Sequence, residues 1–411
     1  MEEANITLSI NTLWVVTSAI LVFFMQAGFA MLEGGLVRSK NTVNVIMKNY
    51  IDMCFASVAF WAVGYGIMYG TNASGLIGTD GFFPSDLTGW DSTVLFYQMM
   101  FAATAATIVS GALAERIRYW PYVFAAVFLS SFVYSVFGSW AWGGTAENPG
   151  WLRGLGFVDL AGSSVVHSIG GWCALSGVIL LGPRTGRFGR AGKVNTIPGH
   201  NLPLVALGAF ILWMGWFGFN GGSALEANAS LGQIVLNTHL GGAGGVMGVI
   251  LALIFKRKPI LITLTINGGL AGLVSVTAGC ATMDPHLALV TGVIGGIFMV
   301  LATELLDYLE LDDAVGAISV HAVGGAWGTL AAGIFFRGDV FNPAIIGVQC
   351  IGILAAFVWG FGTSFIMWKV MQQFVFLRAD AIHEQRGLDF TEHFELGYPE
   401  FQRDALHEGI E

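Results

Sequence analysis

The sequence carries very little charge for its length. Only 11% of its 411 residues are Asp, Glu, Lys or Arg, while 55% are hydrophobic and the mean hydropathy is +0.69. Soluble domains carry about a quarter charged residues, so this composition excludes an ordinary soluble protein. The chain is rich in glycine instead, with 57 residues, and small residues let helices pack closely inside a bilayer. We therefore predict a polytopic, all-α membrane protein.

Signatures of several other protein classes are also missing. The 4 cysteines all stand in apolar segments, which argues against a disulfide framework. The basic residues are confined to short loops, so nothing resembles the basic stripe of a nucleic-acid-binding protein. No Gly-x-Ser-x-Gly elbow, zinc motif or Gly-rich phosphate loop is present. The sequence therefore predicts neither an enzyme nor a nucleic-acid binder, and it calls for no cofactor.

Eleven apolar stretches are long enough to cross a hydrocarbon core, which takes about 20 residues per helix. They cover residues 11–32, 43–70, 93–114, 120–142, 162–182, 202–221, 231–255, 259–279, 285–307, 315–336 and 343–376. With the N-terminus outside and the C-terminus inside, all 18 Lys and Arg except Arg153 and Arg337 lie on the inner side, as the positive-inside rule requires. We expect a transmembrane domain over 1–376 and a cytoplasmic tail over 377–411.

Two short segments of the chain are copies of each other. The first runs Asp159-Leu-Ala-Gly-Ser-Ser-Val-Val-His167-Ser-Ile-Gly-Gly, and the second runs Asp313-Ala-Val-Gly-Ala-Ile-Ser-Val-His321-Ala-Val-Gly-Gly. A shift of 154 residues matches the Asp, the His, one Val and three glycines. A lone histidine in an apolar segment is usually a satisfied core residue. Two histidines at matching depth in the two halves of one chain argue against a purely structural interpretation.

The copies open the fifth and the tenth of the expected spans. Repeat one then covers about 11–182, repeat two covers about 202–336, and the eleventh helix covers 343–376. Because each repeat has an odd number of spans, the two run in opposite directions, as in many transporters. At 1.5 Å per residue each histidine lies about 12 Å inside its own face. In a core about 30 Å thick, the two histidines should meet near the centre.

Ionisable residues inside apolar spans are functional candidates by default; here they are Glu33, Asp52, His167, His239, Glu304, Asp307 and His321. We expect Glu33 and Asp307 to reach the membrane interface and His239 to be structural, which leaves the duplicated pair. Two imidazoles can share one proton, each alternating as donor and acceptor. That suits a small polar solute, or a proton, crossing an apolar pore. A metal needs three or four ligands, and no further His or Cys has matching depth, so no metal is expected.

Aromatic residues stand near the outer ends of three spans. They are Trp142, Phe101 and Phe219, the last in the stretch Trp216-Phe-Gly-Phe-Asn. Aromatic faces attract a partly dehydrated cation by roughly 0.5–2 kcal/mol each. Aromatic belts at membrane interfaces are the ordinary alternative explanation, and the residues alone leave both interpretations open.

Longer motifs run along the whole chain: Ala-Gly-Phe-Ala-Met-Leu-Glu-Gly-Gly, Gly-Ala-Leu-Ala-Glu-Arg, Asp-x7-His, Gly-Pro-Arg-Thr-Gly-Arg-Phe-Gly, His-Asn-Leu-Pro, Trp-Phe-Gly-Phe-Asn and Val-His. In these motifs and their order the chain resembles the ammonium transporter (Amt/MEP/Rh) family. The resemblance implies a homotrimer with one pore per subunit, in the plasma (cell inner) membrane. It also implies ammonium as the substrate.

The resemblance implies a role for each candidate residue. Trp142, Phe101 and Ser223, with Gln98 nearby, would recruit ammonium at an outer site, and Asp159 would hold that site in shape. Phe101 and Phe219 would form the gate below it. His167 and His321 would be the twin histidines of the pore, with Thr277 beside them. Since a full charge in hydrocarbon is prohibitive, the ion should give up its proton and pass as ammonia.

The sequence departs from the family pattern around the second histidine. Gly316 and Ile318 stand where the family commonly has Asp and Phe, and Ala278 follows Thr277 where Pro is usual. The changes at Gly316 and Ile318 predict a less polar and differently shaped inner half of the pore. Residues 144–149 look like an insertion between Trp142 and Asp159. The resemblance assigns the recruiting role to Trp142, with Trp140 as the alternative.

The tail also resembles the family, with Phe394 where Gly is usual. In relatives this region contacts neighbouring subunits and PII-type signal proteins, and some relatives carry a signalling module after it. A second hypothesis is therefore an ammonium sensor, the membrane input domain of a signal-transducing protein with little or no transport.

Overall fold

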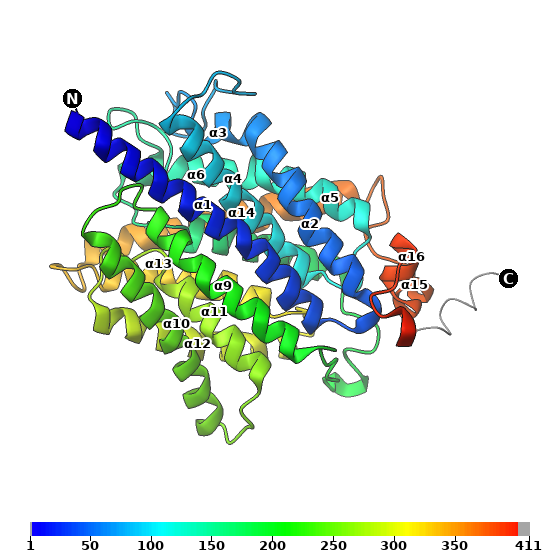
Figure 1. The fold of residues 1–411 in the computed structure, drawn as a ribbon. Coiled ribbons are helices and arrows are strands. Elements are labelled where there is room, and N and C mark those ends of the chain that lie inside the picture. Colours follow the sequence, from blue (N-terminus) through cyan, green and yellow to red (C-terminus); the bar gives the residue numbers. More distant parts are fainter. Residues whose placement is uncertain (1, 402–411) are drawn as a thin grey trace.

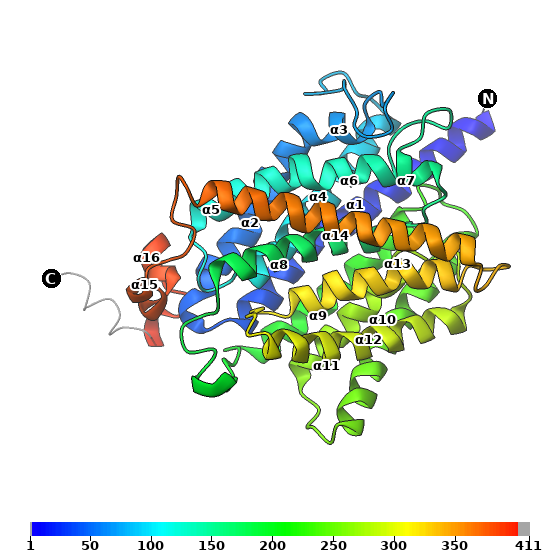
Figure 2. The same cartoon turned by 180° about the vertical axis from the view of Figure 1, so that it is seen from behind.

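The computed structural model describes residues 2–401, which form helices and their connections without any β-strand. Figures 1 and 2 show the helices lying side by side as one elongated bundle, with the short helices α15 and α16 at one end. Nine helices in this part of the chain are long and apolar enough to span a membrane. Two shorter apolar helices, Ile262–Val276 and Ile318–Ile334, coincide with the expected spans 259–279 and 315–336. The prediction of an all-helical protein is confirmed.

The first half of the bundle contains α1 (Glu2–Leu36), α2 (Thr42–Ala59), η2 (Phe60–Gly64), α3 (Tyr65–Tyr69), α4 (Trp90–Ala112), α5 (Tyr119–Phe128), η3 (Leu129–Val133), α6 (Tyr134–Ala141), η4 (Ser163–Ser168) and α8 (Ile169–Leu181). A short η1 (Ser39–Asn41) precedes α2, and the one-turn α7 (Trp151–Gly154) precedes η4. The runs α2–η2–α3 and α5–η3–α6 are each continuous. The first helix extends beyond the expected span 11–32 at both ends.

The second half contains α9 (Leu202–Gly222), α10 (Ser230–Phe255), α11 (Ile262–Val276), α12 (Pro285–Tyr308), η6 (Ile318–Val323), α13 (Gly324–Ile334) and α14 (Pro343–Met371). The 3-10 turn η5 (Arg190–Gly192) lies in the loop before α9, and α15 (Ala381–Arg386), α16 (Leu388–His393) and η7 (Pro399–Phe401) follow α14. The last long helix ends at Met371, short of the expected 376.

Glycines let the helices approach to backbone contact. A Cβ at Gly208 on α9 would lie 2.5 Å from the backbone nitrogen of Leu32 on α1, and a Cβ at Gly28 on α1 would lie 2.8 Å from the Leu212 side chain. Side chains larger than hydrogen would separate these helices. The glycine-rich composition therefore serves close packing, as the sequence predicts.

Each histidine-bearing segment begins with the same backbone device. A glycine in the left-handed region, Gly162 (φ 106°) or Gly316 (φ 86°), precedes one wide π-turn, η4 or η6. Gly adopts this region at no steric cost, and π-turns within helices occur frequently at functional sites. Two further π-turns, η2 and η3, interrupt other spans.

The two histidine segments cross each other reciprocally. A Cβ at Gly171 on α8 would overlap the backbone nitrogen of Ala322, and a Cβ at Gly325 on α13 would lie 2.5 Å from the Oγ of Ser168. The same shift of 154 residues relates Gly171 to Gly325 and Ser168 to Ala322. Each copy thus packs its glycine against the matching position of the other. Figure 2 shows α14 lying alongside α8 and α13.

The tail helices dock on the loops at the end of the bundle where α2 begins. The backbone N–H of Leu388 donates to Asn41 Oδ1 (2.8 Å), and Asp389 Oδ1 accepts from the N–H of Asn44 (2.8 Å). Phe394 follows α16 with φ 57°, a left-handed conformation that Gly adopts freely. This left-handed backbone conformation explains why the family pattern usually has glycine at this position. Residues 402–411, the end of the expected tail, lie outside the described part of the chain.

Candidate functional site

A column of rings runs through the middle of the bundle. The rings of Phe101 on α4 and Phe219 on α9 are stacked, with centroids 4.0 Å apart and planes 14° from parallel. Phe219 in turn stacks on His167 at 5.4 Å, and His167 stacks on His321 at 5.2 Å. All four residues are buried. Residues from α4, α9, η4 and η6 thus form one continuous aromatic path.

The two histidines are in direct contact. The Nδ1 atoms of His167 and His321 lie 3.2 Å apart, so one ring donates its N–H and the other accepts. Their matching depth in two antiparallel helices predicts that these residues lie near each other, and the structure brings them together. His167 Nε2 is buried and has no hydrogen-bond partner within the described residues. A buried polar atom of this kind is free to bind a small solute.

A wide cavity of about 480 Å³ lies above the column. Trp142, Gln98 and Ser223 line it together with Tyr97 and Arg153. Trp142 meets Phe101 edge-on at 6.3 Å and donates its indole N–H to the carbonyl of Asp159 (2.7 Å). Trp142 therefore connects the wall of the wide cavity to the first ring of the column.

Trp140, the alternative tryptophan, faces another part of the molecule. Its ring packs against Phe137, Trp151 and Trp359 at 5.1–5.7 Å. The insertion that follows Trp142 is a tight turn in which Thr145 donates its N–H to the Asn148 carbonyl (3.0 Å). Of the two tryptophans, Trp142 is the one that contacts the aromatic column.

Asp159 caps the first histidine segment. Its carboxylate accepts the N–H groups of four successive residues, Gly162 to Val165, at 2.8–3.0 Å. These are the free donors at the start of a helix, which a carboxylate satisfies well. The side chain points at its own backbone, so Asp159 orders the start of η4 without lining the wide cavity.

Trp216 is a site residue that our sequence reasoning did not single out. Its ring stacks on His167 with centroids 5.1 Å apart, and its indole N–H donates to Thr277 Oγ1 (3.0 Å). Thr277 therefore touches the histidine region through Trp216. The available signal was spacing, because Trp216 precedes Phe219 by three residues and shares its helix face.

Tyr97 is a second site residue that helical spacing could have identified. It precedes Phe101 by four residues, packs its ring 4.7 Å from that ring, and places its hydroxyl 3.1 Å from Ser223 Oγ. Tyr97 thereby links the aromatic column to the polar lining of the wide cavity. Gln98, next to it, accepts a hydrogen bond from the Tyr134 hydroxyl (3.3 Å).

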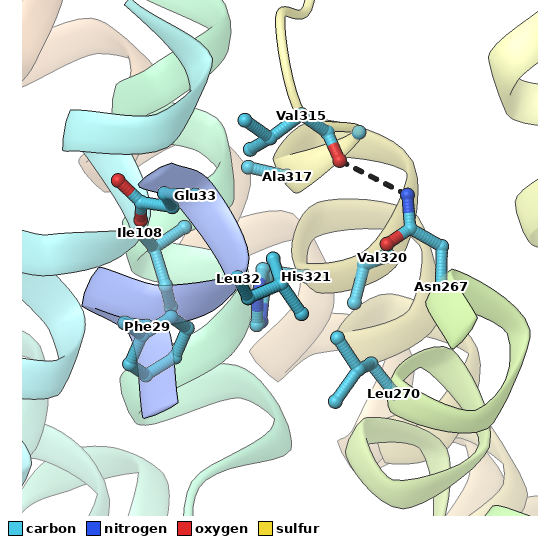
Figure 3. A pocket seen from close by; sticks show the side chains of 11 residues that line it. Phe29, Leu32, Glu33, Ile108, Asn267, Leu270, Val315, Ala317, Val320 and His321 are labelled. Atoms are coloured by element: carbon cyan, nitrogen blue, oxygen red, sulfur yellow. Dashed lines mark hydrogen bonds between the residues drawn. The ribbon is translucent and has the colours of Figure 1, made fainter. Parts of the chain in front are cut away.

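Beyond His321 lies a narrow cavity of about 20 Å³, room for roughly one water-sized molecule. Figure 3 shows Glu33 of α1 on one side of it, His321 near the centre, and Asn267 of α11 opposite, bonded to the Val315 carbonyl (3.0 Å). Most of the other lining residues are apolar, among them Leu32, Ile108 and Leu270. The carboxyl of Glu33 and the amide of Asn267 add polar groups from α1 and α11 to that of His321.

The expectation that Glu33 reaches the membrane interface was wrong. Glu33 is only 2% exposed and accepts a hydrogen bond from the Asn49 side chain (3.0 Å). Asp52 is likewise buried between helices. Asp307 and Glu304 do lie at the protein surface and pair with Arg187 (2.6 Å) and with Lys256 (2.8 Å). His239 packs its ring against Trp213 at 5.6 Å, away from the column.

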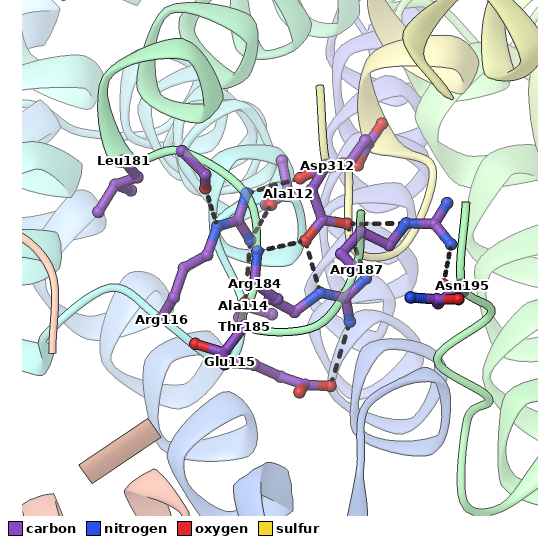
Figure 4. Close-up of polar contacts among 12 residues, drawn as sticks. Ala112, Ala114, Glu115, Arg116, Leu181, Arg184, Thr185, Arg187, Asn195 and Asp312 are labelled. Atoms are coloured by element: carbon purple, nitrogen blue, oxygen red, sulfur yellow. Dashed lines mark hydrogen bonds and ion pairs between the residues drawn. The ribbon is translucent and has the colours of Figure 1, made fainter. Parts of the chain in front are cut away.

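An ion-pair cluster holds the loop before η6. Figure 4 shows Arg184 contacting both Asp312 and Glu115, with Arg116 and Arg187 on either side. Arg184 Nε lies 2.8 Å from Asp312 Oδ2, and Arg184 Nη1 lies 3.2 Å from Glu115 Oε1. Burial opposes ionisation of Asp312, but the hydrogen bonds and charge of Arg184 outweigh it and lower the pKa of Asp312. The next residue, Asp313, caps η6 by accepting three backbone N–H groups at 2.7–3.1 Å.

Comparison with known proteins identifies the family of this chain. The model of the Ammonium Transporter Family matches residues 13–398. The chain belongs to the ammonium transporter family. Ammonium transporter Amt2 of Archaeoglobus fulgidus is 40% identical over 427 residues, which covers 97% of this chain and 90% of the relative.

Solved structures of ammonium transporter family relatives have the same fold. A structure titled "Sensor Amt Protein" matches with a TM-score of 0.92 and 39% identity, covering 96% of this chain and all of that one. Mep2 of Candida albicans matches with a TM-score of 0.82 and 27% identity, over 89% of this chain and 85% of that one. Together with the nine apolar helices, membership of the ammonium transporter family makes this a multi-pass membrane protein and points to a non-enzyme.

Proposed function

We propose that this chain moves ammonium across the membrane, carrying it as ammonia between the wide and the narrow cavity. One observation carries the proposal: the stacked rings Phe101, Phe219, His167 and His321 form one column. At one end Phe101 contacts Tyr97 and Trp142 of the wide cavity, and at the other end His321 lines the narrow cavity. The column is apolar at its Phe end and polar at its His end. The column suits a solute that loses its charge at the phenylalanine pair and needs hydrogen-bond partners at the histidine pair.

In this proposal the wide cavity recruits ammonium. Trp142 and Phe101 offer aromatic faces to a cation, worth roughly 0.5–2 kcal/mol each. Ser223 offers its hydroxyl oxygen, and Gln98 adds a second polar group on the same wall. Arg153 also lines this cavity, but its guanidinium donates to the carbonyls of Trp142, Gly143 and Gly144. Those contacts hold the Arg153 charge on the cavity wall.

The stacked pair Phe101 and Phe219 acts as the gate. A centroid distance of 4.0 Å leaves no room for a hydrated ion between the rings, so passage requires the rings to move and the ion to lose water and its proton. Ammonia then hydrogen-bonds to His167 and His321, whose shared Nδ1 contact leaves other ring nitrogens for the solute. Asp159 and Thr277 position this machinery through η4 and Trp216.

The membrane arrangement belongs to the same proposal. Eleven spans with the N-terminus outside and the C-terminus inside form two inverted units, 11–182 and 202–336, followed by the eleventh helix and the cytoplasmic tail. The reciprocal packing of Gly171 on Ala322 and of Gly325 on Ser168 supports a two-fold relation between the units. The plasma membrane, a homotrimer and contact of the tail with a PII-type protein follow from the family resemblance.

A second candidate is an ammonium sensor with little or no transport. The observation that favours it is the likeness to the structure titled "Sensor Amt Protein", at a TM-score of 0.92. The substitutions at Gly316 and Ile318, next to the second histidine, point the same way. Both hypotheses place ammonium in the wide cavity and differ in whether it passes the gate.

The decisive experiment measures ammonium-evoked current and ammonia uptake in proteoliposomes. The double variant His167→Ala with His321→Ala should reduce transport by about 100-fold or more, the range of lost acid–base groups. His239→Ala is the matched control, because that ring lies away from the column. Full transport by the double variant would overturn the proposed route, and saturable ammonium binding without uptake in the unaltered protein would favour the sensor.

A further inference from the structure

The narrow cavity contains a carboxyl group that the histidine segment itself does not supply. Position 316, where the family pattern commonly has Asp, is Gly in this chain. A Cβ there would lie 2.5 Å from Asn267 Nδ2, so the amide of Asn267 occupies the space beside it. The carboxyl comes instead from Glu33 on α1, which lines the same cavity as His321.

Glu33 belongs to a buried hydrogen-bonded chain between α1, α2, α4 and α5. Asn49 Nδ2 donates to Glu33 Oε2 (3.0 Å), and Thr107 Oγ1 lies 3.2 Å from Asn49 Oδ1 and 3.1 Å from Asp52 Oδ2. The Tyr122 hydroxyl donates to the same Asp52 oxygen (2.5 Å). All of these side chains are at most 2% exposed. Of these hydrogen-bonded side chains, Glu33 is the one that lines the narrow cavity.

One cation accompanies the two carboxyl groups. Lys48 is fully buried, its Nζ lies 5.4 Å above the Tyr122 ring, and it has no hydrogen-bond partner within the described residues. The neighbouring Glu115 is already paired with Arg38 and Arg184. Because an uncompensated buried charge is costly, the least costly state has one ammonium, one carboxylate and one carboxylic acid. The Tyr122 hydroxyl donates to Asp52, and this contact favours the ionised form of Asp52. We therefore place the spare proton on Glu33.

We propose that Glu33 is the proton donor that converts ammonia to ammonium at the inner end of the pore. The inference rests on the proposed transport of ammonium. Ammonia that has passed His321 takes the carboxyl proton: the O–H bond of Glu33 breaks, an N–H bond forms, and ammonium and a carboxylate result. The carboxylate then regains a proton from the histidine pair, which carries the proton released at the wide cavity. One proton therefore enters and leaves per ammonia moved.

Glu33→Gln tests this donor role. The amide keeps the size of the side chain and an oxygen for the Asn49 hydrogen bond, but it cannot donate an acidic proton. The readout is the ratio of charge moved to ammonia taken up in proteoliposomes, which a merely structural change would not alter. We expect the current to fall about 100-fold while ammonia uptake down its gradient stays within a few fold. Glu226→Gln, at an exposed loop carboxylate, is the isosteric control and should leave both unchanged.

Glu33→Asp provides the conservative variant and should retain a measurable part of the current. An unchanged ratio of charge to ammonia in Glu33→Gln would overturn the proposal. If the unaltered protein moves no ammonia, the transport function itself fails. If it does move ammonia, infrared difference spectra test Glu33 separately. Ammonium should perturb a carboxyl C=O band that Glu33→Gln lacks; identical spectra of the two proteins would exclude Glu33 as the donor.

Discussion

The two copies of the histidine segment share their backbone and their mutual packing but differ in the side chains around each histidine. Both begin with an aspartate cap, a left-handed glycine and a π-turn, and both pack a glycine on the other copy. Around His167 the neighbours are the rings of Phe219 and Trp216. Around His321 they are Phe29 at 6.3 Å and the narrow cavity that Glu33 also lines.

This difference indicates different chemical roles for the two ends of the pore. An aromatic surround favours capture and dehydration of a cation, whereas a buried carboxyl group favours return of its proton. The repeated backbone fixes where the two imidazoles meet, and the side chains of other helices decide what each imidazole can do. A duplicated motif therefore predicts position better than it predicts chemistry.

Substitutions of the capping aspartates, Asp159 and Asp313, should have the largest effect on the free energy of unfolding. They test whether the two histidine segments are equally rigid. Asp159→Ala leaves four buried N–H groups without their acceptor, and we expect a loss on the order of 4 kcal/mol of unfolding free energy. Asp313 accepts three such bonds and is half-buried, so Asp313→Ala should cost about 2 kcal/mol. The measurement is thermal unfolding in detergent, followed by tryptophan fluorescence.

Asparagine at each cap is the matched variant, since its amide oxygen still accepts part of the hydrogen bonds. Asp159→Asn should therefore lie between the unaltered protein and Asp159→Ala. A greater loss of stability in Asp313→Ala than in Asp159→Ala would contradict the idea that the first copy is held more tightly by its cap.

The crossing point tests the symmetry of the two copies. Gly171→Ala and Gly325→Ala each place a methyl group against backbone of the opposite copy, and overpacking of this kind costs about 2 kcal/mol. The two losses should be equal if the crossing is symmetric. Gly347→Ala on α14, where a Cβ meets nothing within 4 Å, is the control and should stabilise the helix by up to about 1 kcal/mol. Unequal losses at the two crossing glycines would show that only one copy is tightly packed there.

The sequence predicts the class of this fold well, because long apolar runs permit little besides membrane-spanning helices. It also predicts that His167 and His321 meet, since matching depth in two antiparallel helices fixes their positions. The π-turns at η4 and η6 leave no periodic signal in the apolar runs. The ends of the spans were less well predicted. Helix α1 continues past residue 32 to Leu36, because Glu33 is buried between helices and does not terminate the helix.

The site was predictable where neighbouring residues of one helix share a face, and not where separate helices meet. Trp216 and Tyr97 could have been found from Phe219 and Phe101 by helical spacing. Glu33 could not, because hydropathy does not distinguish a carboxyl at the interface from one bonded to Asn49 across two helices. The contact of Arg184 with Asp312 likewise joins two loops that the sequence separates by 128 residues.

The smallest expected effect distinguishes the two histidines by their hydroxyl neighbours. Thr277→Val removes the acceptor of the Trp216 indole N–H, and Thr303→Val removes a 3.1 Å contact with Ser319 on η6. Each should cost about 1 kcal/mol of stability, measured as above. Only Thr277→Val should also weaken ammonium binding, by about fivefold if that energy appears in affinity, because Trp216 stacks on His167 beneath the recruiting end. Titration of tryptophan fluorescence with ammonium measures this, and equal affinities in the two variants would mean that Trp216 does not position the first histidine.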